Sequence, residues 1–190
     1  MKTTHVPIHL ATGFVIAALL VGFAFGQLMT PEYRAHMYAP AQMDLGPAGA
    51  LVDLHYLNAM IGHHVVAMRL AEQLAQNSKR PAMQELAKSI LADEPAAIAE
   101  LYAWKKQWYQ DTRTVPDPAV PNLGPAGETF DLRFINAMIA HHQEGINMTR
   151  EIRTKSIRHE VLDNADKVEA FLINGTQTLE ALRSDWYTTP

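Results

Sequence analysis

Two adjacent histidines follow a methionine at two places in this chain, with the same spacing each time. The two sets are Met60, His63 and His64, and Met138, His141 and His142. Thioether sulfur is a soft, neutral donor that favours Cu(I), and imidazole binds copper in either oxidation state. These residue types at this spacing predict a site for a soft metal ion, with copper, as Cu(I), the expected cofactor and Ag(I) an analogous ligand.

The histidine pairs belong to an internal repeat whose two copies lie 78 residues apart. Residues 45–64 and 123–142 are identical at 13 of 20 aligned positions, and Trp108-Tyr109 and Trp186-Tyr187 extend the same offset. A duplicated fold requires matching apolar positions. It does not require a histidine pair within an apolar helix, so the pair is the feature that indicates a function.

Helical geometry places further methionines beside the histidines. Each residue of a helix advances by about 100°, so Met60, His64 and Met68 fall on one stripe that overlaps the core positions. Met148 follows His141 by seven residues and stacks over it in the second copy. We therefore expect two imidazoles and two thioethers on adjacent turns in each copy, with His64 and its counterpart in the core.

The spacing of apolar residues predicts an all-α protein. Periods of three and four residues indicate helices at about 50–76, 81–110, 127–155 and 158–187, with Pro95 expected to kink or break the second. Residues 45–110 and 123–190 then form two helical hairpins, joined by a proline-rich crossover at 111–122. Neither hairpin can bury its apolar face alone, so we predict that they pair as a four-helix bundle.

The N-terminal region predicts export. Lys2 precedes an apolar run from about residue 6 to 25 without a charged side chain, which is typical of a signal peptide or an uncleaved membrane anchor within residues 1–26. The remainder of the chain is then periplasmic or at the cell surface, anchored to the inner membrane by this hydrophobic helix if it is retained. Residues 27–44 form a linker in which His36, Met37 and Met43 offer an auxiliary metal site.

Composition excludes several classes of protein. The absence of cysteine excludes disulfides, thiolate metal sites and a cysteine nucleophile, and a net charge of -4 does not favour nucleic acid as a partner. A di-iron oxidase needs paired Glu-x-x-His motifs, and this sequence contains none. We therefore expect a binding protein and not an enzyme.

The segments Met60-Ile61-Gly62-His63-His64 and Met138-Ile139-Ala140-His141-His142-Gln143, together with Met148, resemble the bacterial family catalogued as domain of unknown function 305. The resemblance covers nearly all of the chain after the linker, in two copies. It implies a ferritin-like four-helical fold and an exported copper binder, since some members bind copper and are linked to metal tolerance. The second copy matches the motif well. The first departs from it, because Leu70 stands where the second copy has Met148.

Two functions from different classes remain open on these observations. The first is an exported protein that sequesters or carries copper and exchanges it with a protein partner. The second is a membrane-tethered helical interaction or stress domain, whose histidines form a polar core and bind no metal.

Overall fold

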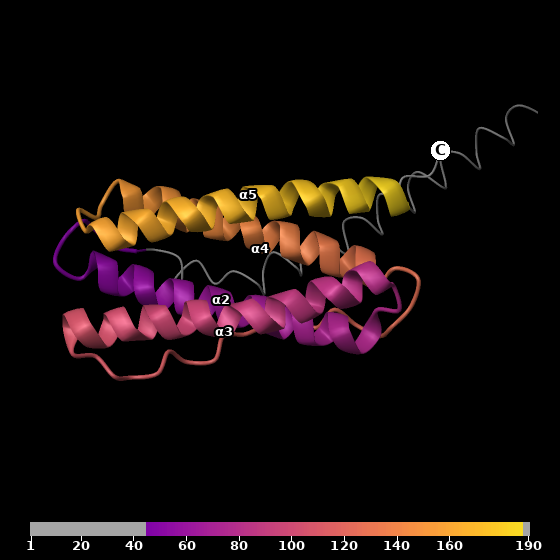
Figure 1. Ribbon diagram of the computed structural model, residues 1–190, viewed down its shortest axis with the longest axis horizontal. Coiled ribbons are helices and arrows are strands. Elements are labelled where there is room, and N and C mark those ends of the chain that lie inside the picture. Colours follow the sequence, from indigo (N-terminus) through magenta and orange to yellow (C-terminus); the bar gives the residue numbers. More distant parts are fainter. Residues whose placement is uncertain (1–44, 188–190) are drawn as a thin grey trace, which may run out of the picture. The chain divides into compact units, whose positions relative to one another are not determined.

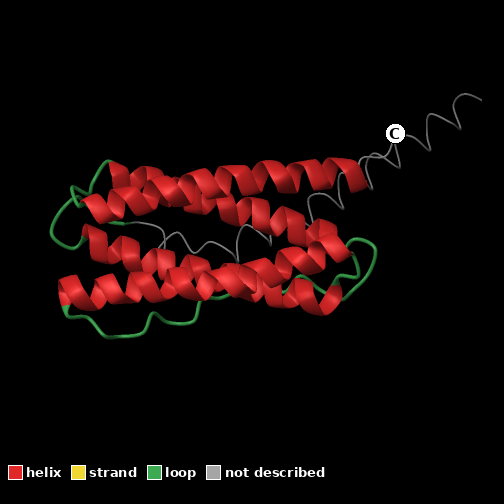
Figure 2. Cartoon of the chain, viewed as in Figure 1, coloured by secondary structure: helices red, strands yellow, loops and turns green. Residues whose placement is uncertain are grey.

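A computed structural model describes residues 45–187 of the chain as four helices joined by short turns and one long crossover (Figure 1). The helices are α2 (Val52–Asn77), α3 (Pro81–Tyr109), α4 (Phe130–Arg153) and α5 (His159–Tyr187). No strand occurs among the described residues, which confirms the all-α prediction (Figure 2). The predicted N-terminal helix and the linker residues His36, Met37 and Met43 lie outside this range. None of the four helices combines the length and apolarity needed to cross a bilayer.

The helix bounds differ from the predicted ones by at most three residues, but Pro95 does not break α3. The helix continues through it from Pro81 to Tyr109. Pro95 lies on the exposed face of α3, so its ring meets solvent and does not disturb the packed face. The buried side chains Ala87 and Leu101 flank the proline and hold both halves of the helix against the core.

The two hairpins, α2–α3 and α4–α5, meet along α2 and α4. One buried cluster joins Tyr56 and Leu57, near the start of α2, to Met148 and Ile152, near the end of α4. The inner helices therefore run antiparallel, and the repeats are related by an approximate two-fold axis. This packing confirms the bundle of duplicated hairpins. It also places the middle of α2 against the middle of α4, where the histidine pairs lie.

The turn before each inner helix is built in the same way in both repeats. Gly46 and Gly124 adopt φ of 71° and 79°, a left-handed conformation that glycine accepts at little cost. His55 Nδ1 donates to the carbonyl of Leu45 at 3.0 Å, and Arg133 Nε donates to the equivalent carbonyl of Leu123 at 2.5 Å. His55 therefore has a structural role that arginine fulfils in the other repeat.

Two symmetry-related contacts, which we call the clamps, connect the hairpins at opposite ends of α2 and α4. Each consists of an aspartate at the start of an inner helix, an arginine before an outer helix of the other repeat, and a tryptophan. The members are Asp131, Arg80 and Trp186 in one clamp, and Asp53, Arg158 and Trp108 in the other. The ion pairs measure 3.0 Å and 3.2 Å, and the guanidinium carbons lie 4.5 Å and 4.2 Å from the indole centroids.

We expect Arg80→Ala and Arg158→Ala each to lower the free energy of unfolding by about 1–2 kcal/mol, because each change leaves a buried or half-buried aspartate without its cation and an indole without its cation–π partner. The double variant should lose as much free energy of unfolding as the two single variants together, because distant sites act independently. Urea denaturation of the single and double variants measures both quantities. A double variant no less stable than the singles would contradict this description of the clamps.

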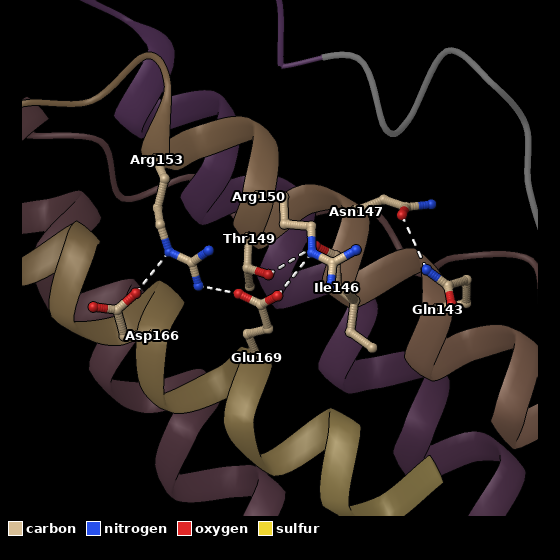
Figure 3. A network of polar contacts seen from close by, with 8 residues as sticks. All are labelled: Gln143, Ile146, Asn147, Thr149, Arg150, Arg153, Asp166 and Glu169. Carbon is tan, nitrogen blue, oxygen red and sulfur yellow. Dashed lines mark hydrogen bonds and ion pairs between the residues drawn. The ribbon is translucent and has the colours of Figure 1, made fainter. Parts of the chain in front are cut away.

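Within the second hairpin, charged side chains bind α4 to α5 (Figure 3). Glu169 accepts from Arg150 Nε at 2.8 Å and also from Arg153, whose Nε reaches Asp166 at 2.6 Å. Glu169 is only 8% exposed, and the hydrogen bonds from the two arginines lower the pKa of its carboxyl. The network fixes the register of α5 on α4, and thereby the position of the α5 residues that face the histidines.

Candidate metal centre

The centre of the inner helix pair is a stacked pair of imidazoles. The rings of His63 and His141 lie with centroids 3.7 Å apart and planes at 17°. His63 Nε2–H also donates to the backbone carbonyl of His141 at 3.0 Å, which leaves Nδ1 of His63 as its lone-pair nitrogen. His63 and His141 form this contact between the repeats, whereas His142, for which a core position is predicted, is buried at 8% exposure against the outer helix of its own hairpin.

Burial keeps these histidines neutral. Desolvation, with a smaller repulsion from His64, lowers the pKa of His63 to about 3, and desolvation with a smaller repulsion from His63 holds the pKa of His141 well below its usual value. Desolvation also lowers the pKa of His142 to about 4. Since a histidine must be deprotonated to bind a metal ion, all three are in the required form at neutral pH.

The second histidine of each pair faces the outer helix of its own hairpin. His64 Nδ1 contacts the carboxylate of Glu94 on α3. His142 Nδ1 lies 3.2 Å from Oγ1 of Thr176 on α5, and that hydroxyl donates its proton to the Leu172 carbonyl at 2.8 Å. Carboxylate and hydroxyl oxygens are therefore both acceptors here, so each ring donates from Nδ1, and Nε2 is the nitrogen that remains to bind a ligand.

Two helical glycines make room for the rings. A Cβ on Gly145 of α4 would collide with Leu172 and lie 2.8 Å from Cε1 and Nε2 of His63. A Cβ on Gly175 of α5 would lie 2.7 Å from Cε1 of His142. These glycines allow the imidazoles to pack against helix backbone.

The methionines predicted as ligands lie around this centre in different ways. Met60 and Met148 belong to one buried cluster, although they come from different repeats. Met138 is also buried, at 2% exposure, and Met68 is half-buried.

The distances between the ring centroids indicate which pairs of histidines could bind one ion without moving. With a metal–nitrogen distance of about 2.0 Å, two imidazoles on one ion place their centroids roughly 5–6.5 Å apart. The centroids of His63 and His64 are 6.1 Å apart, and those of His141 and His142 are 6.3 Å apart. The stacked pair is too close, and its lone pairs lie in parallel planes, so an ion shared by His63 and His141 would require a ring to rotate.

Within residues 45–187, no group of three or more His, Asp or Glu side chains is arranged to hold a metal ion. Nitrogen and oxygen ligands alone therefore do not complete a site among the described residues. The other candidate donors on these two helices are the buried thioethers of Met60, Met138 and Met148, and thioether sulfur is a soft donor.

Sequence reasoning missed the partners of the outer histidines, although a signal for one was present. Glu94 occupies the apolar stripe of α3 formed by Ala87, Leu91, Ile98 and Leu101. A carboxylate on such a stripe needs a partner. Thr176 and the two helical glycines carry no comparable pattern, because their role depends on which rings the neighbouring helix presents.

The fold and the buried histidines and methionines define a helical protein of two duplicated hairpins with a polar centre between them. The chain belongs to the family described as domain of unknown function (DUF305), whose model matches residues 53–128 and 117–183. No curated protein matches it in sequence.

Solved structures extend the comparison. CopM in the Cu(I)-bound form is 28% identical to this chain, with a TM-score of 0.64 over 72% of this chain and 98% of CopM. CopM in an Ag-bound form is 27% identical, with the same coverage and TM-score. A DUF305 protein from Streptomyces coelicolor, named as a candidate secreted protein, is 15% identical, with a TM-score of 0.62 over 70% of this chain and 91% of its own, and shows the shared fold alone.

Proposed function

We propose that this chain is an exported protein that sequesters or carries copper, held as Cu(I) by histidine and methionine side chains, in metal tolerance or homeostasis. Membership of DUF305 and the likeness to CopM, which was solved with Cu(I), Cu(II) and Ag, support the choice of metal. Ag(I) is expected to bind at the same residues, because it is a soft monovalent ion like Cu(I).

The observation that carries the proposal is the neutral imidazole centre among buried sulfurs. His63 and His141 meet between the hairpins, with His64 and His142 next to them, and desolvation lowers the pKa of His63, His141 and His142. A structural core would be satisfied by apolar residues at these positions, at no desolvation cost. Imidazole nitrogens that remain unprotonated, on the same helices as buried methionines, are instead suited to a soft cation.

Anaerobic titration with Cu(I) against a competing chelator tests the proposal. We expect binding tighter than micromolar in the wild-type chain, and a loss of at least about 100-fold when His63, His64, His141 and His142 are replaced by alanine, because these are the histidines that form the centre among residues 45–187. His55→Ala, which removes an imidazole with a structural partner only, should retain the affinity. Micromolar or weaker binding by the wild type would overturn the proposal.

The proposal includes the location and the partners of the protein. The apolar run in residues 1–26 and the candidate secreted relative support an extracytoplasmic location, with attachment to the membrane if the run is retained. The stacked centre is closed, so delivery would require a metal-exchange partner that competes for the outer histidines. No catalytic role is assigned to any residue, and we propose that the chain is not an enzyme.

The second candidate, an interaction domain with structural histidines, is favoured by one specific observation. His63, His64 and His142 each have a hydrogen-bond partner in the absence of metal. The alanine variants distinguish the two functions. If the histidines are purely structural, the wild-type protein does not bind copper, and the substitutions lower only the stability of the fold.

A further inference from the structure

His63 and His64 form the first half of the centre, and His141 and His142 form the second half. The surroundings of the two halves differ at one charged residue. His64 and His142 are equivalent under the repeat, and both present Nδ1 to the outer helix of their own hairpin. The acceptor for His64 is a carboxylate, whereas the acceptor for His142 is a hydroxyl. Neither acceptor is duplicated, because Leu172 stands where the first repeat has Glu94, and Ile98 stands where the second has Thr176.

Glu94 is well placed to act on an ion through His64. The side chains of His64 and Glu94 are 13% and 16% exposed, so water screens the carboxylate only in part. The carboxylate accepts from Nδ1–H, and Nε2 is then the coordinating nitrogen on the opposite side of the ring. An ion at Nε2 therefore lies within one imidazole ring of a fixed negative charge. At His142 the equivalent position has no such charge.

We infer that Glu94 is a positioning residue that makes the first half of the metal centre select divalent copper over monovalent copper. The inference rests on the proposed copper binding. The attraction between a carboxylate and an ion grows with the charge of the ion, so the same residue stabilises Cu(II) more than Cu(I). The acceptor at His142 is the neutral hydroxyl of Thr176, so the second half lacks this contribution.

The chemistry of the donors agrees with this division. Imidazole supported by a carboxylate is a harder ligand environment than imidazole among thioethers, and harder ligands favour the higher oxidation state. Met148, on the stripe beside His141, has no counterpart in the first repeat, where Leu70 takes its place. Beside its histidine pair, the first repeat therefore has the carboxylate of Glu94 and no methionine at the position of Met148.

The test begins on the metal-free full-length chain labelled with 15N-histidine. Long-range 1H–15N spectra report which ring nitrogen carries the proton. We expect His64 in the Nδ1–H form in the wild type, and a shift toward the Nε2–H form in Glu94→Leu, which introduces the residue of the other repeat. Glu94→Gln keeps an acceptor oxygen without the charge and should preserve the Nδ1–H form. A wild-type His64 protonated on Nε2 would overturn the positioning role.

The second measurement is the affinity of the same variants for Cu(II) and for Cu(I), each by chelator competition. Glu94→Leu and Glu94→Gln should each lower the affinity for Cu(II) by about 10- to 100-fold. The factor by which they lower the affinity for Cu(I) should be about ten times smaller. A tenfold difference between the two losses corresponds to a rise of about 59 mV in the reduction potential of the bound copper. Glu100→Leu, which removes an exposed carboxylate from the same helix, should change neither affinity.

The outcomes separate this inference from the proposed function. A wild-type chain that binds copper, with equal losses for both oxidation states in the Glu94 variants, overturns the selectivity and leaves copper binding intact. A wild-type chain that binds neither ion overturns the proposed function and the selectivity with it. Thr176→Val should weaken binding of both oxidation states equally, because it disturbs His142 without removing a charge.

Discussion

Lowering the pH from 7 to 5 should reduce the free energy of unfolding of the metal-free protein by about 4 kcal/mol through His63 and His142, at about 2 kcal/mol each, with a further loss through His141. In the folded state the pKa of His63 is about 3 and that of His142 about 4, and the pKa of His141 is also well below its usual value. The unfolded chain titrates these residues near pH 6.5. Protons therefore bind the unfolded state first, and the stability is lost as the pH falls below about 6.5.

The loss should flatten below about pH 4, where the folded protein also begins to take up protons. Urea denaturation at half-unit steps of pH measures the profile, and a double His63→Gln, His141→Gln variant should lose most of the slope. Glu169, whose carboxyl has a lowered pKa, destabilises the fold only at lower pH, below the range of the histidines. A free energy of unfolding that stays constant between pH 7 and 5 would contradict the burial of neutral imidazoles.

Adding one methyl group at Gly145 should destabilise the protein by about 1–3 kcal/mol, since overpacking forces side chains off their preferred conformations. The new Cβ of Gly145→Ala would collide with Leu172 and press on the His63 ring, which is already held against His141 on its other side. We expect the copper affinity to fall as well, because the stacked rings would have to move. Urea denaturation and Cu(I) competition measure the two effects.

Gly62→Ala is the matched control for this change. Gly62 also lies within a helix beside the histidines, but no atom lies within 4 Å of a Cβ added there. Because alanine has the higher helix propensity, Gly62→Ala should stabilise the protein by about 0.5–1 kcal/mol. If both variants changed the stability in the same direction and by the same amount, Gly145 would have no role in seating His63.

The helices and their pairing followed from the sequence because they depend on periodicity and duplication. Apolar residues recur with the helical period in both repeats, and two half-buried hairpins have few ways to bury their faces. The effect of Pro95 was predicted less well. A proline on the outer face of a packed helix disturbs only its own backbone, and the sequence does not show which face will be outermost.

The faces of the histidine pairs could not be assigned in the same way. Adjacent residues on a helix point about 100° apart, so His63 and His64 border two different neighbours. Which of them meets the other repeat depends on how α2 crosses α4, and that angle is set by contacts along the whole interface. The methionines show the same limit, because Met60 and Met148 come together only through the antiparallel pairing of two repeats.

The clamps have a consequence for the origin of the chain. Each clamp takes its aspartate from one repeat and its arginine from the other. A single hairpin therefore contains one partner of each ion pair and cannot form either ion pair by itself. An ancestor of half this length would have satisfied the same contacts by self-association into a symmetric homodimer. Gene fusion would then have tied the subunits together through the crossover at 111–122. After fusion, the two copies of each position were free to diverge. Glu94 is one example, because the aligned residue of the second repeat is Leu172.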